Sequence, residues 1–217
     1  MLAVGSGALL AGPEADLLHL LVLVPEAAAG ATDALLAGDR EIAAAVASTL
    51  ASMDDLCARA ASAIAGALGQ DGLPRAELLR LAEARHAVPE IASATSPLRC
   101  VLQAAQDGLG AELTPRCRGL VQRLAELACD LWRLAADAAV DGGDGRGLDR
   151  AGAQIDLLEE RLWGEMLSAS TGPGIALRLV PVARTYVRLA FAGASVTRRA
   201  WGWQISGEAC AGPRRGG

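Results

Sequence analysis

Apolar side chains recur at helical spacing along several long stretches of this chain, and this periodicity constrains the fold more than any other feature. Between residues 42 and 68 they return in steps of three and four, and between 120 and 134 leucine returns with a heptad rhythm. Such spacing draws one apolar stripe along a helix. Aromatic residues make up only 3% of the chain, whereas β-sandwiches and barrels depend on aromatic and β-branched strands. We therefore expect an all-α protein.

Proline and glycine divide the chain into six helical stretches. The breaks are expected at 37–39, 69–73, 110–114, 141–147 and 171–174. Asp39 and Thr114 precede the second and fourth stretches, where a side-chain oxygen can cap the first free N–H groups of a helix. Pro89 and Pro97 fall inside the third stretch, so we expect them to bend or cut it.

The two halves of the chain show a faint internal repeat. Proline opens the last helix of each half, at Pro74 and Pro173, and Leu-Arg-Leu follows at a comparable point in both. The sequence therefore predicts two tandem antiparallel three-helix bundles, over 14–110 and 111–205, with a flexible tail over 206–217. The alternative is that Ala-rich helices resemble one another by composition alone.

Charge and cysteine content exclude several classes of protein. The chain has 20 basic residues, all of them arginine, against 25 acidic ones, so its net charge is −5. A nucleic-acid partner is not expected, because phosphate binding needs a concentrated basic face. The five cysteines include no C-x-x-C pair, which favours free thiols in a reducing compartment. The apolar run 17–24 is too short to span a membrane, so we expect a cytoplasmic protein.

Three passages resemble the PhoU-like family, in particular its branch of accessory proteins that accompany phosphate transporters. They are residues 34–41, which look like the first interhelical turn, 155–167, which are similar to the fifth helix, and 176–189, which are similar to the last helix. The resemblance implies two tandem three-helix bundles and a regulatory role in phosphate transport. It also implies a membrane phosphate transporter or sensor as partner, met at the inner face of the membrane.

The resemblance also implies a metal site from which this chain departs. Family members carry two carboxylates four residues apart on the last helix of each bundle, and such a pair can hold a cation. The matching positions of the last helix are Val187 and Phe191, which cannot bind a metal. In the third helix the nearest counterparts are Glu83, His86 and Glu90. These three form the candidate site for a divalent metal, and the competing interpretation is a solvated polar stripe interrupted by Pro89.

A second candidate site lies near the end of the last helix. Arg198, Arg199, Trp201 and Trp203 combine cationic and aromatic side chains, which are common where proteins contact one another. The competing interpretation is that the tryptophans pack against the end of the bundle. No nucleophile, acid–base or metalloenzyme motif occurs in the sequence, so we do not expect an enzyme.

Three functional hypotheses follow from these features. The first is a non-enzymatic regulator of phosphate transport without a required cofactor, which docks a helical face onto a transporter or sensor. The second is a metal-dependent sensor built on the candidate site of the third helix. The third is a helical scaffold or adaptor unrelated to phosphate. A homodimer is a further partner that the sequence leaves open.

Overall fold

The computed structural model describes residues 13–141, 147–168 and 171–210, and over these residues the chain forms helices and no strand. The helices are α1 (Pro13–Ala37), α2 (Arg40–Leu68), α3 (Arg75–Thr95), α4 (Leu98–Gln106), α5 (Leu109–Glu112), α6 (Pro115–Asp141), α7 (Leu148–Met166) and α8 (Pro173–Cys210). The all-α fold predicted from the periodicity is thereby confirmed. The glycine-rich loop 142–146 and the end of the predicted tail, 211–217, lie outside the described residues.

Local sequence signals account for most helix ends. The Asp39 carboxylate accepts hydrogen bonds from the backbone N–H groups of Glu41 (2.8 Å) and Ile42 (3.1 Å), so it caps α2 as predicted. The Thr114 hydroxyl accepts one from Cys117 N–H at 3.1 Å and caps α6. Gly38, between α1 and α2, has a φ of 69°, a left-handed conformation that glycine adopts without steric cost.

The prolines act differently from one another. Pro97 stands at the start of α4 and separates it from α3, which is the cut that the sequence predicts. Pro89, in contrast, lies within α3, and the helix continues through it to Thr95. Pro25 and Pro181 are likewise contained within α1 and α8. The helix α8 also runs on to Cys210, past residue 205, where the sequence predicts that the last helix ends.

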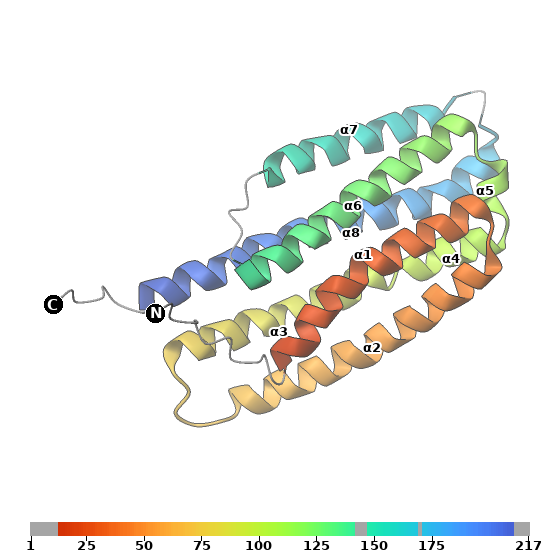
Figure 1. Cartoon of the computed structure of the whole chain (residues 1–217). Coiled ribbons are helices and arrows are strands. Elements are labelled where there is room, and N and C mark those ends of the chain that lie inside the picture. The colour runs from red at the N-terminus through yellow and green to blue at the C-terminus, as the bar shows by residue number, and fades with distance from the viewer. Residues whose placement is uncertain (1–12, 142–146, 169–170, 211–217) are drawn as a thin grey trace, which may run out of the picture.

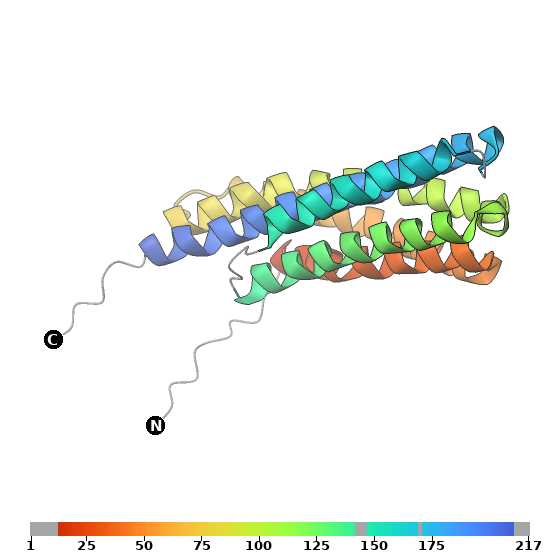
Figure 2. The same cartoon turned by 90° about the horizontal axis from the view of Figure 1, so that it is seen from above.

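The helices lie side by side along one long axis, in two groups of three rods. One group consists of α1, α2 and the broken rod α3–α4–α5, and the other of α6, α7 and α8 (Figure 1). The groups meet where α1 packs on α6 and where α3 and α4 pack on α8, whereas α2 and α7 lie on opposite outer sides. Their buried apolar side chains join into one hydrophobic cluster. α8 extends beyond the ends of α6 and α7 (Figures 1 and 2).

Buried polar contacts join the two groups. The hydroxyl groups of Thr32 on α1 and Tyr186 on α8 lie 2.6 Å apart. Thr32 already donates its proton to the Ala28 carbonyl at 2.7 Å, so Tyr186 is the donor between the two hydroxyls. The Cys129 thiol of α6 donates to the Pro25 carbonyl of α1 at 3.4 Å. These contacts fix the register of the groups, because a buried polar atom without its partner is costly.

One helix could cross a membrane by length and composition alone. It covers Ala15–Ala37 of α1, and 56% of its most apolar window is buried inside the protein. A core helix of a soluble protein passes the same test, so this finding is weak evidence for a membrane span.

Candidate functional site

The cationic helix of this acidic chain is α8. It carries five arginines, and Glu208 is its only acidic residue. The arginines are Arg178, Arg184, Arg188, Arg198 and Arg199. Arg178, Arg188 and Arg199 contact α3, α5 or the loop before α5, whereas Arg184 and Arg198 are exposed, as is the side chain of Arg188. The five arginines include Arg198 and Arg199 of the predicted docking site, and Arg199 contacts two of the predicted metal residues.

Arg199 joins α8 to the candidate metal residues of α3. Its Nη1 lies 3.9 Å from Oε2 of Glu83, and its Nε lies 3.4 Å from Oε2 of Glu90. The Glu90 side chain is 24% exposed, compared with 42% for Glu83. A guanidinium, which is always charged at physiological pH, therefore lies within ion-pair distance of both carboxylates.

His86 does not share this arrangement, since its side chain is exposed on α3. In the part of the chain that the structure describes, no group of three or more His, Cys, Asp or Glu side chains is placed to hold a metal ion. A metal at Glu83 and Glu90 would have to compete with the Arg199 guanidinium already between them. The metal site thus stays a prediction, and the observed geometry offers it two ligands rather than three.

Two further arginines of α8 contact the first group. Arg178 donates to the Glu112 carboxylate at 2.7 Å and to the Asp107 carbonyl at 2.9 Å. Arg188 donates to the Ser93 hydroxyl at 3.4 Å. The sequence analysis does not identify these contacts. The available signal is the spacing of Arg178, Arg188 and Arg199 by ten and eleven residues, or about three helical turns each time, which keeps them near one side of α8.

The predicted docking residues have different surroundings. Arg198 is exposed, whereas Arg199 is engaged by the two glutamates of α3. The backbone of Trp201 and Trp203 belongs to α8, but their side chains lie outside the described part of the structure. The aromatic part of the predicted docking patch therefore stays a prediction.

The solvent-facing side of α8 is basic with an aromatic centre. Exposed side chains recur in steps of four, three and seven, which places them on one stripe of the helix. They are Arg184, Arg188, Phe191 and Arg198, and the stripe continues toward the start of α8 through Pro181 and Leu177, which are also exposed. Phe191 is 46% exposed, whereas Val187, the other position that departs from the family's carboxylate pair, is buried. Neither Arg184 nor Arg198 forms an ion pair within the described residues.

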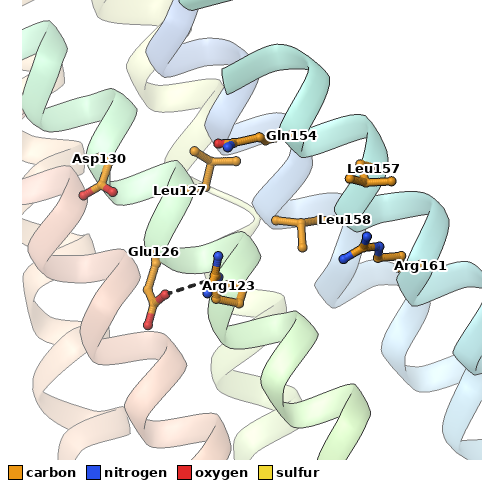
Figure 3. A pocket seen from close by; sticks show the side chains of 8 residues that line it. All are labelled: Arg123, Glu126, Leu127, Asp130, Gln154, Leu157, Leu158 and Arg161. Carbon is orange, nitrogen blue, oxygen red and sulfur yellow. Dashed lines mark ion pairs between the residues drawn. The ribbon is translucent and has the colours of Figure 1, made fainter. Parts of the chain in front are cut away.

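A surface groove of about 280 Å³ lies between α6 and α7 (Figure 3). Its lining residues are Arg123, Glu126, Leu127, Asp130, Gln154, Leu157, Leu158 and Arg161. Arg123 and Glu126 form an ion pair at 4.0 Å on α6, and the α7 side is formed by two leucines together with Gln154 and Arg161. The groove contains no hydroxyl, thiol or imidazole nucleophile, so its chemistry is that of a solvated helix surface.

Burial makes the thiols of Cys57 and Cys129 unsuited to nucleophilic chemistry. Cys57, Cys100, Cys117 and Cys129 are free, and burial raises the pKa of Cys57 and that of Cys129 to about 11. Since the thiolate is the reactive form, both thiols are protonated and inert near neutral pH.

Comparison with known proteins identifies similar solved structures but no relative by sequence. No protein-family model matches the chain, and no curated protein matches it. Among solved structures, PhoU from Pseudomonas aeruginosa is similar with a TM-score of 0.77 and 14% identity, over 89% of this chain and 95% of that one. The phosphate transport system regulatory protein PhoU from Streptococcus pneumoniae gives a TM-score of 0.74 and 16% identity, over 88% and 93%. The chain therefore has a PhoU-like fold.

Proposed function

We propose that this protein is a non-enzymatic regulator of inorganic phosphate transport that docks onto a transporter or sensor at the cytoplasmic face of the membrane. The observation that carries the proposal is the PhoU-like fold, which covers 89% of this chain and 95% of the Pseudomonas aeruginosa protein. The likeness thus involves both three-helix groups, together with their arrangement, and not one common helical motif.

The chemistry of the described residues supports binding in preference to catalysis. The four described cysteines are free, and the three whose pKa departs from the ordinary value are all raised by burial. The exposed side chains of α8 include arginines, Phe191 and Leu177, which suit contact with another protein. Regulation would then follow from a shift in the population of docked and free protein.

Deletion of the gene in its native host tests this function. We expect uptake of radiolabelled phosphate, and the response to phosphate starvation, to change in the deletion strain and to return with the wild-type gene. A matched strain that carries an unrelated helical protein controls for expression. Unchanged uptake and an unchanged starvation response would reject the proposal and would favour a scaffold unrelated to phosphate.

The metal-sensor hypothesis has a separate test. Equilibrium dialysis with manganese, iron and zinc should give no stoichiometric binding at the α3 carboxylates, because the Arg199 guanidinium already pairs with Glu83 and Glu90 and a cation would have to displace it. Stoichiometric metal that is lost in His86→Ala would instead establish a sensor, whether or not phosphate uptake depends on the protein.

A further inference from the structure

The charge along the outer side of α8 contrasts with that of the helices beside it. Arg184, Arg188 and Arg198 are exposed there, and Phe191 lies between them with 46% of its side chain exposed. Between Arg184 and Arg198 the stripe is about 21 Å long at 1.5 Å per residue. The chain as a whole has a net charge of −5, so this basic stripe stands out from its background.

Acidic residues flank the stripe on the α7 side. Asp149, Asp156 and Glu160 are exposed and recur at steps of seven and four residues, so they share one face of α7. Gln154 and Arg161 line the groove toward α6, which places the acidic face on the side of α7 turned away from α6 (Figure 3). No ion pair connects these acids to the arginines of α8 within the described residues.

The α3 side of the stripe is also acidic. Glu83 and Glu90 lie there, with Arg199 between them. A basic strip about one helix wide is therefore bordered by carboxylates on both sides. A flat anionic bilayer would bring its headgroups against these carboxylates as well, and like charges repel. A narrow acidic ligand that follows the helix meets the arginines alone.

We propose that the exposed stripe of α8, formed by Arg184, Arg188, Phe191 and Arg198, binds an acidic protein segment in which carboxylates flank an apolar side chain. The arginines pair with the carboxylates, and Phe191 supplies the apolar contact that holds the segment in register. The inference deepens the proposed docking function and rests on it for the partner, which would present such a segment on the transporter or sensor.

Fluorescence anisotropy tests the surface directly. The probe is a fluorescein-labelled peptide of two Glu-Glu-Leu-Glu-Glu-Ala-Leu repeats, added to the full chain at low and at high salt. We expect saturable binding that weakens as salt rises, since exposed charges are screened. Reversal of two charges in Arg184→Glu/Arg188→Glu should weaken binding by about tenfold or more. Phe191→Ser should weaken it by a smaller factor and leave the salt dependence unchanged.

The matched control reverses two exposed arginines on the opposite side of α7, in Arg150→Glu/Arg161→Glu. It changes the net charge by the same amount and should leave peptide binding unchanged. Circular dichroism shows whether each variant is folded, and Arg184→Gln/Arg188→Gln is the milder replacement if the reversal unfolds the chain. Equal loss in both charge-reversed variants would mean that bulk charge binds the peptide, and would overturn the assignment.

Two further outcomes separate this inference from the function on which it rests. Binding to phosphatidylglycerol vesicles without binding to the peptide would replace the protein partner by a membrane and overturn the inference. A deletion strain with altered phosphate uptake, combined with no peptide binding, would refute the surface and keep the function. Peptide binding that depends on Arg184 and Arg188, with normal uptake in the deletion strain, would keep the surface and refute the function.

Discussion

Substitution of one glycine tests how closely α5 packs against the end of α1, at a point where Arg118 of α6 also makes contact. Gly110 of α5 is buried against the end of α1, and a Cβ atom added there would lie 1.7 Å from the Leu35 carbonyl oxygen. Ordinary contact begins at 3.4 Å, so α5 and α1 would have to separate by about 1.7 Å. This separation would also disturb Arg118 of α6, because its guanidinium donates hydrogen bonds to the carbonyls of both Gly110 and Leu36.

The cost of Gly110→Ala follows from these contacts. Overpacking at a closely packed site costs about 1–3 kcal/mol. A hydrogen bond from a charged group contributes about 1.5–3 kcal/mol, and part of the contribution from Arg118 is lost when its two acceptors move apart. We expect the free energy of unfolding to fall by about 3–5 kcal/mol, a large share of the ~5–15 kcal/mol that is typical of a domain.

Urea unfolding followed by tryptophan fluorescence measures this loss, since Trp132 is fully buried and reports on the core. The matched control is Gly119→Ala on the exposed side of α6, where an added Cβ meets nothing within 4 Å. It should stabilise the protein by about 0.5–1 kcal/mol, because alanine has the higher helix propensity. A change below about 0.5 kcal/mol in Gly110→Ala, or an equal loss in both variants, would refute the reasoning.

Three other predictions concern buried or paired polar groups. Tyr186→Phe should lower the free energy of unfolding by about 1 kcal/mol, because Thr32 loses the hydroxyl that donates to it; an unchanged urea midpoint would contradict this. Burial raises the pKa of Cys129 from about 9 to about 11, so its contribution to stability is complete below pH 9 and is lost as the pH rises through 11. The free energy of unfolding, measured across this pH range, should therefore fall less steeply with pH in Cys129→Ala than in the wild type. Arg199→Ala should open a site between its two glutamate partners, so manganese binding measured by dialysis should rise relative to the wild type, and an unchanged affinity would argue against competition by the guanidinium.

Helix positions and caps could be predicted because they depend on residues close in sequence. The stripe Leu148, Ile155, Leu162 and Met166 is buried along α7, as its spacing indicates. Asp39 caps α2 through N–H groups two and three residues away. Both features are settled within a few turns of one helix.

The candidate site was predicted only in part. The sequence identifies Glu83, His86 and Glu90 as a candidate metal site and Arg199 as a docking residue, so it assigns the glutamates and the arginine to separate sites. In the structure they lie together, because α8 packs against α3. Arg199 is more than one hundred positions from Glu83 in the chain, so the residue pattern around Glu83 gives no sign of this contact.

The sequence by itself determined that this chain folds into long helices that carry apolar stripes, and where most of these helices begin. Only the tertiary structure decided that Arg199 faces two glutamates, that Gly110 touches the end of α1 and that Arg184, Arg188 and Arg198 are exposed. The physical reason is that periodicity fixes which face of a helix is apolar, while the polar contacts depend on the register and crossing of helices that meet only after the core has packed.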